Sequence, residues 1–468
     1  MSIIIYKKLE MMLYMCYIYE TEGGVMWKSV FKLAIPVAIQ SIMFSLFNIF
    51  DQIMVGTLGT TAVVSVGLGA KIFFILLFTM IGLTGGLGIL SAQLIGSEQT
   101  EKISKIQGMT MFAGSVLVLV FVILSMVFPR FCMTLFTNDE KVISLGIKYH
   151  RAIALGYIPF FLNIIYVTIL RNAKIVKIPL YATIVGLGVN TLFNYILIFG
   201  KFGFPKLGVL GAGIATTSSQ TISCIILLSI VYGKKLIGSY SIKELLQFLT
   251  FDKDILLYWK LTLPTLIENI SFIATDSISN SIYGYMGTKQ TIAVTIMFPI
   301  QGAIIGFFSG FSTASSVLVG NYLGKNEKEK AYIISKKILI LASVAPLIVG
   351  CIYLLFNNLY LTIFKLSPYS LEMTKKVMYF MVIFAPIKIF NMTITNGALT
   401  AGGETKFVLY QSIIGSWVFA VPMGYISAFI LHFPIYYVFV SISFAEILRA
   451  CLCYYKYMNK SWLNNLVS

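Results

Sequence analysis

Long apolar runs recur along the whole chain, and they constrain its fold more than any other feature. Only 11% of the 468 residues are charged and 58% are hydrophobic, whereas about 25% of residues are charged in a typical soluble domain. Each run is long enough to cross a hydrocarbon core about 30 Å thick. The sequence therefore predicts an all-α polytopic membrane protein with twelve transmembrane helices. The expected spans are 29–56, 62–95, 104–128, 142–170, 179–199, 210–232, 255–283, 291–323, 332–356, 370–399, 407–431 and 434–455.

The basic residues between these spans are distributed unevenly, although the net charge of +17 taken alone would suggest a nucleic-acid partner. Connections after even-numbered spans hold sixteen Lys and Arg, and the other connections hold about six. In membrane proteins such an excess lies on the cytoplasmic side. We therefore expect a multi-pass protein of the cell membrane, with both termini in the cytoplasm and no nucleic-acid partner. The basic connections are 96–105, 171–177, 233–260, 324–337 and 402–406.

Histidine and cysteine do not indicate a metal centre. His150 and His432 are the only histidines, and they are far apart in the sequence. The six cysteines show no spacing typical of a zinc site or of a disulfide framework. We expect no resident metal and no cofactor.

Residues 1–28 form an N-terminal extension before the predicted spans. Charged residues interrupt its apolar run and no small-residue cleavage site follows, so it is not typical of a signal peptide. Codons for the Glu-Gly-Gly at 22–24 are compatible with a ribosome-binding sequence just ahead of Met26. We expect natural translation to begin at Met26. N-terminal sequencing tests this, and a peptide containing Tyr14 would contradict it.

An internal repeat divides the chain into two units of six helices. A shift of 228 residues aligns Pro36 with Pro264 and Gly96 with Gly324, among other matches. Because six is even, both units enter the membrane from the same side, as in transporters whose halves are related by an axis along the membrane normal. The expected units are an N-terminal lobe at 29–232, a cytoplasmic linker at 233–253, a C-terminal lobe at 254–460 and a tail at 461–468. Within the linker, "IKELLQFL" predicts a short amphipathic helix on the membrane surface.

Asp51 is the only charged residue from Leu33 to Ala70. A carboxylate in the middle of a transmembrane helix costs roughly 2.5–3.5 kcal/mol on translocon-insertion scales. A water-filled cavity, a polar partner or a bound cation must lower that cost. The alternative is a carboxylate that faces lipid headgroups at the interface.

A second polar cluster lies in the fifth and sixth spans. Asn190 and Asn194 are four residues apart and so share one helical face, and Thr216 follows in the small-residue segment "GVLGAGIATTSSQ". Carboxylate, amide and hydroxyl oxygens together suit Na⁺ or H⁺ better than a soft metal. The alternative is that these side chains only hydrogen-bond between helices.

With these features the sequence resembles multidrug and toxic compound extrusion (MATE) transporters over roughly residues 28 to 455. The resemblance rests on "KLAIP", on Asp51 fifteen residues after Pro36 in "FDQIMVGTLG", on "AQLIGSEQTEK", on the asparagine pattern, on "GAGIAT" and on the duplicated architecture. It implies twelve helices in two lobes. It also implies export of bulky, often cationic organic compounds, driven by inward Na⁺ or H⁺.

The resemblance also implies roles for individual residues. Positions matching Asp51, Asn190, Asn194 and Thr216 take part in cation coupling in the family, and the proline matching Pro36 lets the first helix bend. Many members carry a second aspartate where this chain has Asn194. One Na⁺ or one H⁺ neutralises a site with a single carboxylate, so both ions stay open, and Na⁺ is the metal ion that Asp51 could hold.

The C-terminal lobe lacks a copy of this polar site. The repeat aligns Asp51 with Ser279, Asn190 with Phe419 and Asn194 with Met423, so we expect cation coupling to belong to the N-terminal lobe. Acidic residues of the C-terminal lobe could instead attract a cationic drug, or could simply form hydrogen-bonded helix contacts. These acidic residues are Glu268, Asp276 and Glu446.

The sequence favours a monomeric secondary antiporter in the lipid bilayer that exports organic cations, and it is not expected to be an enzyme. The main alternative is a related flippase of lipid-linked saccharide precursors, which would be expected to show a cationic cavity. Lys71, Arg151 and Lys388 lie in or near spans but form no recognisable cluster in the sequence. A membrane-embedded enzyme would need a polar catalytic constellation, and none is apparent. Single-channel currents would distinguish an ion channel.

Overall fold

The computed structural model describes residues 2–250, 252–362, 364 and 366–468; side chains are not described for residues 2–25, 48, 288 and 289. Over these residues the chain is helical and contains no strand. The longer helices are α1 (Ser2–Gly56), α2 (Thr60–Leu83), α3 (Gly85–Gly96), α4 (Lys102–Val127), α6 (Glu140–Ala154), α7 (Tyr157–Asn172), α8 (Lys177–Phe199), α9 (Val209–Gly233), α11 (Lys253–Tyr285), α12 (Thr288–Gly324), α13 (Lys328–Thr362), α14 (Pro368–Thr393), α15 (Thr405–Ile413) and α17 (Ile435–Met458). Short elements are α5 (Pro129–Thr134), α10 (Ile242–Leu245), the 3₁₀ turn η1 (Leu246–Leu249), α16 (Val421–Tyr425) and the π-helical segments η2 (Ile394–Leu399), η3 (Ile414–Ala420) and η4 (Ile426–Ile430).

These elements form twelve membrane-length units, close to the bounds expected from the sequence. Among the described residues, ten units are apolar and long enough to span a bilayer, and α6 with α7 makes an eleventh that bends by 47°. The twelfth, α11, has 33 residues but includes Glu268 and Asp276, which lower its hydropathy. Four expected spans are not single uninterrupted α-helices: 62–95 divides at Thr84 into α2 and α3, and 142–170 divides into α6 and α7. The spans 370–399 and 407–431 contain π-helical segments, η2 in the first and η3 and η4 in the second.

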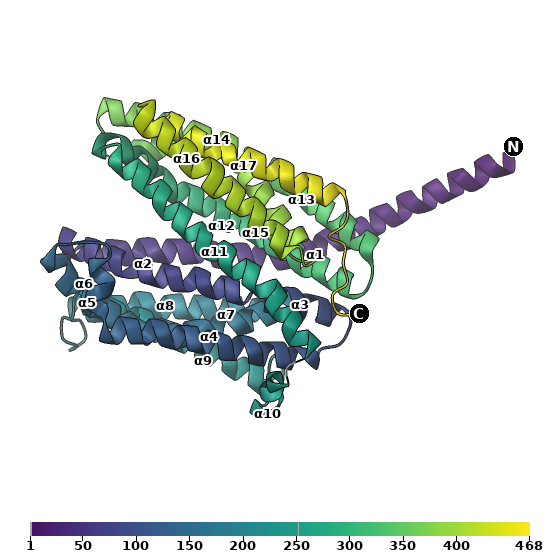
Figure 1. The fold of residues 1–468 in the computed structure, drawn as a ribbon, viewed down its shortest axis with the longest axis horizontal. Coiled ribbons are helices and arrows are strands. Elements are labelled where there is room, and N and C mark those ends of the chain that lie inside the picture. Colours follow the sequence, from purple (N-terminus) through teal and green to yellow (C-terminus); the bar gives the residue numbers. More distant parts are fainter. Residues whose placement is uncertain (1, 251, 363, 365) are drawn as a thin grey trace.

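The twelve units form two lobes that meet at one end and diverge at the other (Figure 1). The first lobe contains α1 to α9 and the second contains α11 to α17. The meeting end carries the connection 97–101 and the C-terminal residues, and we call it the basic end because the Lys- and Arg-rich connections lie there. The C-terminal end of α1 lies toward the diverging end, and Asp51 belongs to the last two turns of this helix.

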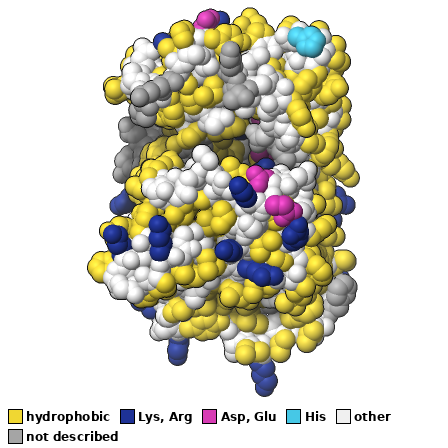
Figure 2. All heavy atoms as spheres, turned by 90° about the vertical axis from the view of Figure 1, so that its left-hand side faces the viewer, with side chains coloured by type: hydrophobic (Ala, Val, Ile, Leu, Met, Phe, Trp, Pro, Cys, Tyr) yellow, Lys and Arg dark blue, Asp and Glu magenta, His cyan; other side chains and the backbone are white. Residues whose placement is uncertain are grey.

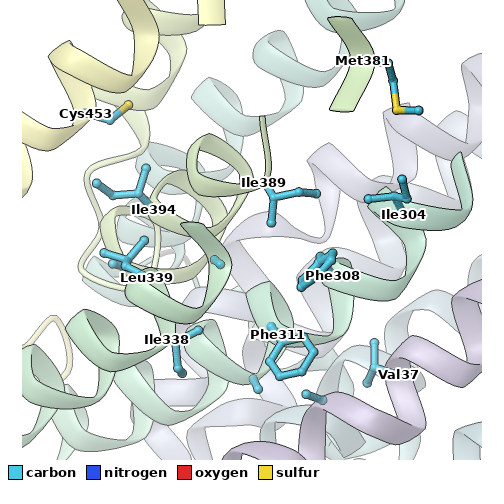
Figure 3. Close-up of a cluster of buried hydrophobic side chains, with 14 of the residues drawn as sticks. Val37, Ile304, Phe308, Phe311, Ile338, Leu339, Met381, Ile389, Ile394 and Cys453 are labelled. Atoms are coloured by element: carbon cyan, nitrogen blue, oxygen red, sulfur yellow. The ribbon is translucent and has the colours of Figure 1, made fainter. Parts of the chain in front are cut away.

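Each lobe receives one helix face from the other, and the exchange follows the internal repeat. Val30 and Leu33 of α1 belong to the buried core of the C-terminal lobe, where Val37 lies near Phe308 and Phe311 (Figure 3). The residues 228 positions later, Tyr258 and Leu261 of α11, belong to the buried core of the N-terminal lobe.

The lobes cross most closely at the basic end, again at repeat-related positions. A Cβ atom on Gly96 would lie 2.1 Å from the Asn321 carbonyl oxygen, and one on Gly324 would lie 2.0 Å from the Gln93 carbonyl oxygen. The side chains of the same two residues reach across: Gln93 donates to the Ala401 carbonyl at 2.8 Å, and Asn321 donates to the Asn172 carbonyl at 3.4 Å. Glycine is needed at 96 and 324 because two backbones touch there.

The linker between the lobes contains the short helix expected in "IKELLQFL". Ser241 and Glu244 form a capping box at the start of α10. Phe248 stacks on Phe112 of α4 with 5.3 Å between ring centroids, and Ile242 and Leu249 are exposed. The linker is thus attached to the N-terminal lobe and presents an apolar edge outward.

Candidate functional site

Asp51 is joined to the two asparagines of α8 by a continuous chain of hydrogen bonds. The Asn194 amide donates to the Asp51 carboxylate and to Asn190 Oδ1 at 2.6 Å. Asn190 in turn donates to Thr216 Oγ1 at 3.4 Å and to Ser219 Oγ at 3.5 Å. The four residues expected to couple cations therefore lie together, on helices α1, α8 and α9.

Small residues let these helices approach. Gly211 of α9 packs on the backbone of Leu197 in α8, and Gly213 packs on Ala152 and on the Tyr149 carbonyl of α6. A Cβ at either glycine would come within 3.0 Å of these atoms. The "GAG" of the sixth span therefore places Thr216 and Ser219, one turn further on, against the asparagines of α8.

The oxygen atoms of this cluster suit a small hard cation. Asn190 and Asn194 are completely or almost completely buried, and Asn194 Oδ1 has no hydrogen-bond partner among the described residues. A buried acceptor without a partner costs about 1–3 kcal/mol, so this oxygen is a candidate ligand atom for a cation. The described residues contain no group of three or more His, Cys, Asp or Glu side chains that could hold a metal. The cluster is thus a single carboxylate with neutral oxygens.

Residues near Pro36 attach α1 to both lobes. Gln40, one turn after the proline, accepts from Arg171 Nη2 at 2.5 Å and donates to Thr183 Oγ1 at 2.7 Å, both in the N-terminal lobe. Ser41 is hydrogen-bonded to Ser309 of α12 at 3.0 Å. Since proline leaves one helical carbonyl without its usual donor, α1 has its weakest turn beside the contacts that hold it to each lobe.

A cavity opens in the C-terminal lobe beside the hollow between the lobes. It holds about 1070 Å³ of empty space, part of it open to solvent. Viewed from the diverging end, the molecule is hollowed between the two lobes (Figure 2). The charged residues that line the cavity are Asp276, Glu446, Lys388 and Arg449. Aromatic lining comes from Phe272, Tyr283, Phe298, Phe384 and Phe439.

The predicted acids of this lobe have different surroundings. Glu446 accepts from Asn391 at 2.7 Å and pairs with Arg449 at 3.5 Å. Asp276 lines the cavity and accepts only from Asn280, at 2.9 Å, among the described residues. Glu268 accepts from Asn269 at 3.4 Å and is not among the cavity-lining residues. Asp276 is thus the acid most available to a ligand.

Comparison with known proteins identifies the family. The sequence model of the MatE family matches residues 36–196 and again residues 264–426. The two matches begin 228 residues apart, which is the offset of the internal repeat. The chain belongs to the MATE family. Members of this family are transport proteins rather than enzymes and need no cofactor.

Relatives of this MATE protein match it over most of their length. It is 25% identical over 403 residues to the "Probable multidrug resistance protein YoeA" of Bacillus subtilis, with 86% of each chain covered. It is 25% identical over 415 residues to the "Probable multidrug resistance protein NorM" of Thermotoga maritima, with 88% of this chain and 87% of the relative covered.

Solved structures confirm the two-lobe fold of twelve helices. A MOP superfamily transporter from Pyrococcus furiosus, described as having a binding pocket of reverse polarity, superposes with a TM-score of 0.84 at 21% identity and covers 93% of this chain and 96% of that one. A crystal structure of MATE in the bent conformation gives 0.81 at 20% identity, with 94% and 96% covered. The MATE resemblance and the all-α, twelve-helix prediction are therefore correct.

Sequence reasoning missed several residues of the MATE protein's N-terminal site. Ser219 is three residues after Thr216, so helical spacing alone could have indicated it. Gln40 follows Pro36 by one turn, and Arg171 is a charged residue at the end of a span. Tyr149, whose side chain lies beside Thr216 and Asp51, gave no sequence signal, because it is one aromatic among many.

Proposed function

We propose that this MATE protein is a secondary active antiporter that exports bulky, often cationic organic compounds in exchange for Na⁺ or H⁺. The observation that supports the proposal best is the hydrogen-bonded cluster at Asp51, with one carboxylate and the unpartnered oxygen of Asn194. The names of its relatives as probable multidrug resistance proteins support export of drugs.

Coupling follows from the position of Asp51 on the same helix as Pro36. A cation at Asp51 neutralises the carboxylate and competes for the oxygens that now bind the amide of Asn194. Since α1 also packs in the core of the C-terminal lobe, a change in its bend at Pro36 changes the fit between the lobes. Cation binding at Asp51 in this way favours release of the drug.

The substrate site we propose is the cavity of the C-terminal lobe. Asp276 offers a carboxylate whose only described donor is a neutral amide, and the aromatic lining can stack on flat cations. Glu446 would act mainly through its pair with Arg449. We keep Glu268 in the proposal as a second acidic residue that attracts the cationic substrate. It lies on the same helix as Asp276, two turns away, but does not line the cavity.

Ethidium efflux from proteoliposomes tests the proposal. Efflux is measured under an imposed Na⁺ gradient and, separately, under a proton gradient, for the wild type and for Asp51→Asn. We expect efflux under one gradient, lost in Asp51→Asn and retained in the control Glu140→Gln, whose exposed carboxylate forms an ion pair with exposed Arg130. Unchanged ion-driven efflux in Asp51→Asn would contradict the coupling role.

A second candidate is transport of a compound with an anionic group, such as a lipid-linked saccharide precursor. It is favoured by Lys388, which lines the cavity and forms no ion pair among the described residues. The two candidates differ in which substitution abolishes transport. Asp276→Asn should impair export of organic cations, and Lys388→Ala should impair transport of an anionic substrate.

We also propose that the protein is monomeric, with the basic end and both termini in the cytoplasm. The excess of Lys and Arg in the connections at that end supports this orientation. Labelling with an impermeant thiol reagent tests the orientation: Glu101→Cys should react only in inside-out vesicles. Light scattering in detergent tests the oligomeric state.

A further inference from the structure

The residues after α17 cross the basic end and are anchored first in the C-terminal lobe. Trp462 is fully buried, stacks on Tyr457 with 5.2 Å between centroids, and donates its indole N–H to the Tyr457 carbonyl at 3.0 Å. Its own carbonyl lies against Gly402, where a Cβ atom would come within 1.8 Å of the oxygen. The close packing holds the tail at one fixed place beside the α14–α15 connection.

The tail then makes its next contacts with the N-terminal lobe. Gln93 of α3 donates to the Asn464 carbonyl at 3.1 Å and accepts the Leu466 N–H at 2.7 Å. Gln99 donates to the Val467 carbonyl at 3.4 Å. With its bond to Ala401, the buried Gln93 side chain uses both of its N–H donors and one acceptor position of its oxygen on the C-terminal lobe and the tail.

Beneath the tail lies a cavity with about 610 Å³ of empty space, part of it open to solvent, whose lining comes from both lobes. The N-terminal lobe supplies Leu90, Leu94, Gln99, Lys102 and Ile106, the start of α11 supplies Asp254 and Leu257, and the tail supplies Leu466, Val467 and Ser468. The tail therefore covers the seam where the two lobes meet.

We propose that residues 462–467 form a strap that holds the basic end closed, and that its N-terminal-lobe contacts break each time the basic end opens. The proposal rests on one part of the proposed function: a transporter of two lobes must open at each end in turn. Parting the lobes separates Gln93 from Ala401 and from the tail together. The tail stays with the C-terminal lobe, because Trp462 is buried there, and leaves Gln93 and Gln99.

Reversible crosslinking tests whether release is required. In a cysteine-free background, Gln99→Cys and Val467→Cys are joined by a bis-methanethiosulfonate reagent, whose disulfide bonds a reductant cleaves, and transport is measured before and after cleavage. The matched control joins Lys460→Cys to Glu329→Cys, two exposed residues of the C-terminal lobe that form an ion pair at 3.8 Å. We expect the first crosslink to stop transport reversibly and the control to leave it within about twofold. Normal transport with the first crosslink complete overturns the proposal.

A distance measurement tests the strap without any transported compound. Spin labels on Glu101→Cys and Lys328→Cys report the separation of the lobes at the basic end, and Gln99→Ala with Leu466→Ala weakens the strap. We expect the population at the longer distance to rise at least about fivefold, the effect of losing roughly one hydrogen bond. Ser461→Ala, in the exposed part of the tail, is the control. An unchanged distance distribution overturns the strap, whereas a changed distribution with no drug transport overturns only the proposed substrate.

Discussion

The crossing of the lobes at the basic end predicts a large difference between two glycine substitutions in the same helix. In α12, a Cβ on Gly324 would lie 2.0 Å from the Gln93 carbonyl oxygen, whereas one on Gly302 would meet nothing within 4 Å. Real Cβ contacts are essentially never shorter than 3.0 Å. Gly324→Ala must therefore move the two backbones apart by about 1 Å, because neither can yield as a side chain would.

The cost follows from known effects of overpacking. Forcing an extra methyl group into a packed contact costs about 1–3 kcal/mol. Gly302→Ala should instead stabilise the helix by up to about 1 kcal/mol, since alanine is the better helix former. Thermal unfolding in detergent should therefore place Gly324→Ala below the wild type and Gly302→Ala at or above it. Equal melting temperatures for the two variants would refute the close crossing.

Three further predictions concern polar contacts. The hydrogen bond from Lys105 holds the pKa of Asp252 below its usual 3.8, so this carboxylate stabilises the start of α11 above that pH, and the contribution is lost as the pH falls through the lowered pKa. The protection of these amides from hydrogen exchange, relative to the unstructured chain at the same pH, should therefore fall in acid, and Asp252→Asn should remove the dependence. Arg171→Met should slow transport at least about tenfold by removing a charged hydrogen bond to Gln40, worth about 1.5–3 kcal/mol; an unchanged rate would mean that this contact does not position α1. Asn194→Leu should destabilise the protein by about 1–3 kcal/mol. The coupling ion should also raise the melting temperature of this variant less than that of the wild type, and equal ion-induced shifts would count against the cation site.

The duplicated scaffold carries an unduplicated site. Ser279, the repeat counterpart of Asp51, donates to the Thr275 carbonyl of its own helix at 2.9 Å, and the counterparts of the asparagines are the exposed apolar residues Phe419 and Met423. The contacts between the lobes still follow the repeat: Gly96 packs on the backbone of Asn321, and its repeat counterpart Gly324 packs on the backbone of Gln93. Repeat symmetry is thus retained where the lobes pack and is lost where polar chemistry is placed.

Much of the site could be anticipated from sequence. Asn190 and Asn194 share a face because their spacing matches the helical turn, and an isolated aspartate in an apolar run needs a polar partner. What could not be anticipated is which neutral groups complete the cluster. Tyr149 comes from α6, and its approach depends on the close contact of its backbone with Gly213 of α9, which no local pattern reveals.

The sequence by itself determined the membrane class, the helix bounds and the repeat, because hydrophobic length and periodicity are local properties of the chain. Only the tertiary structure decided that Asp51 meets Asn194, that Asp276 shares a cavity with Lys388, and that the tail lies across the lobe seam. Each of these depends on side chains far apart in sequence. Whether these side chains meet depends on how the helices pack against one another. Glycine residues allow close packing, but their positions in the sequence do not specify which helices come together.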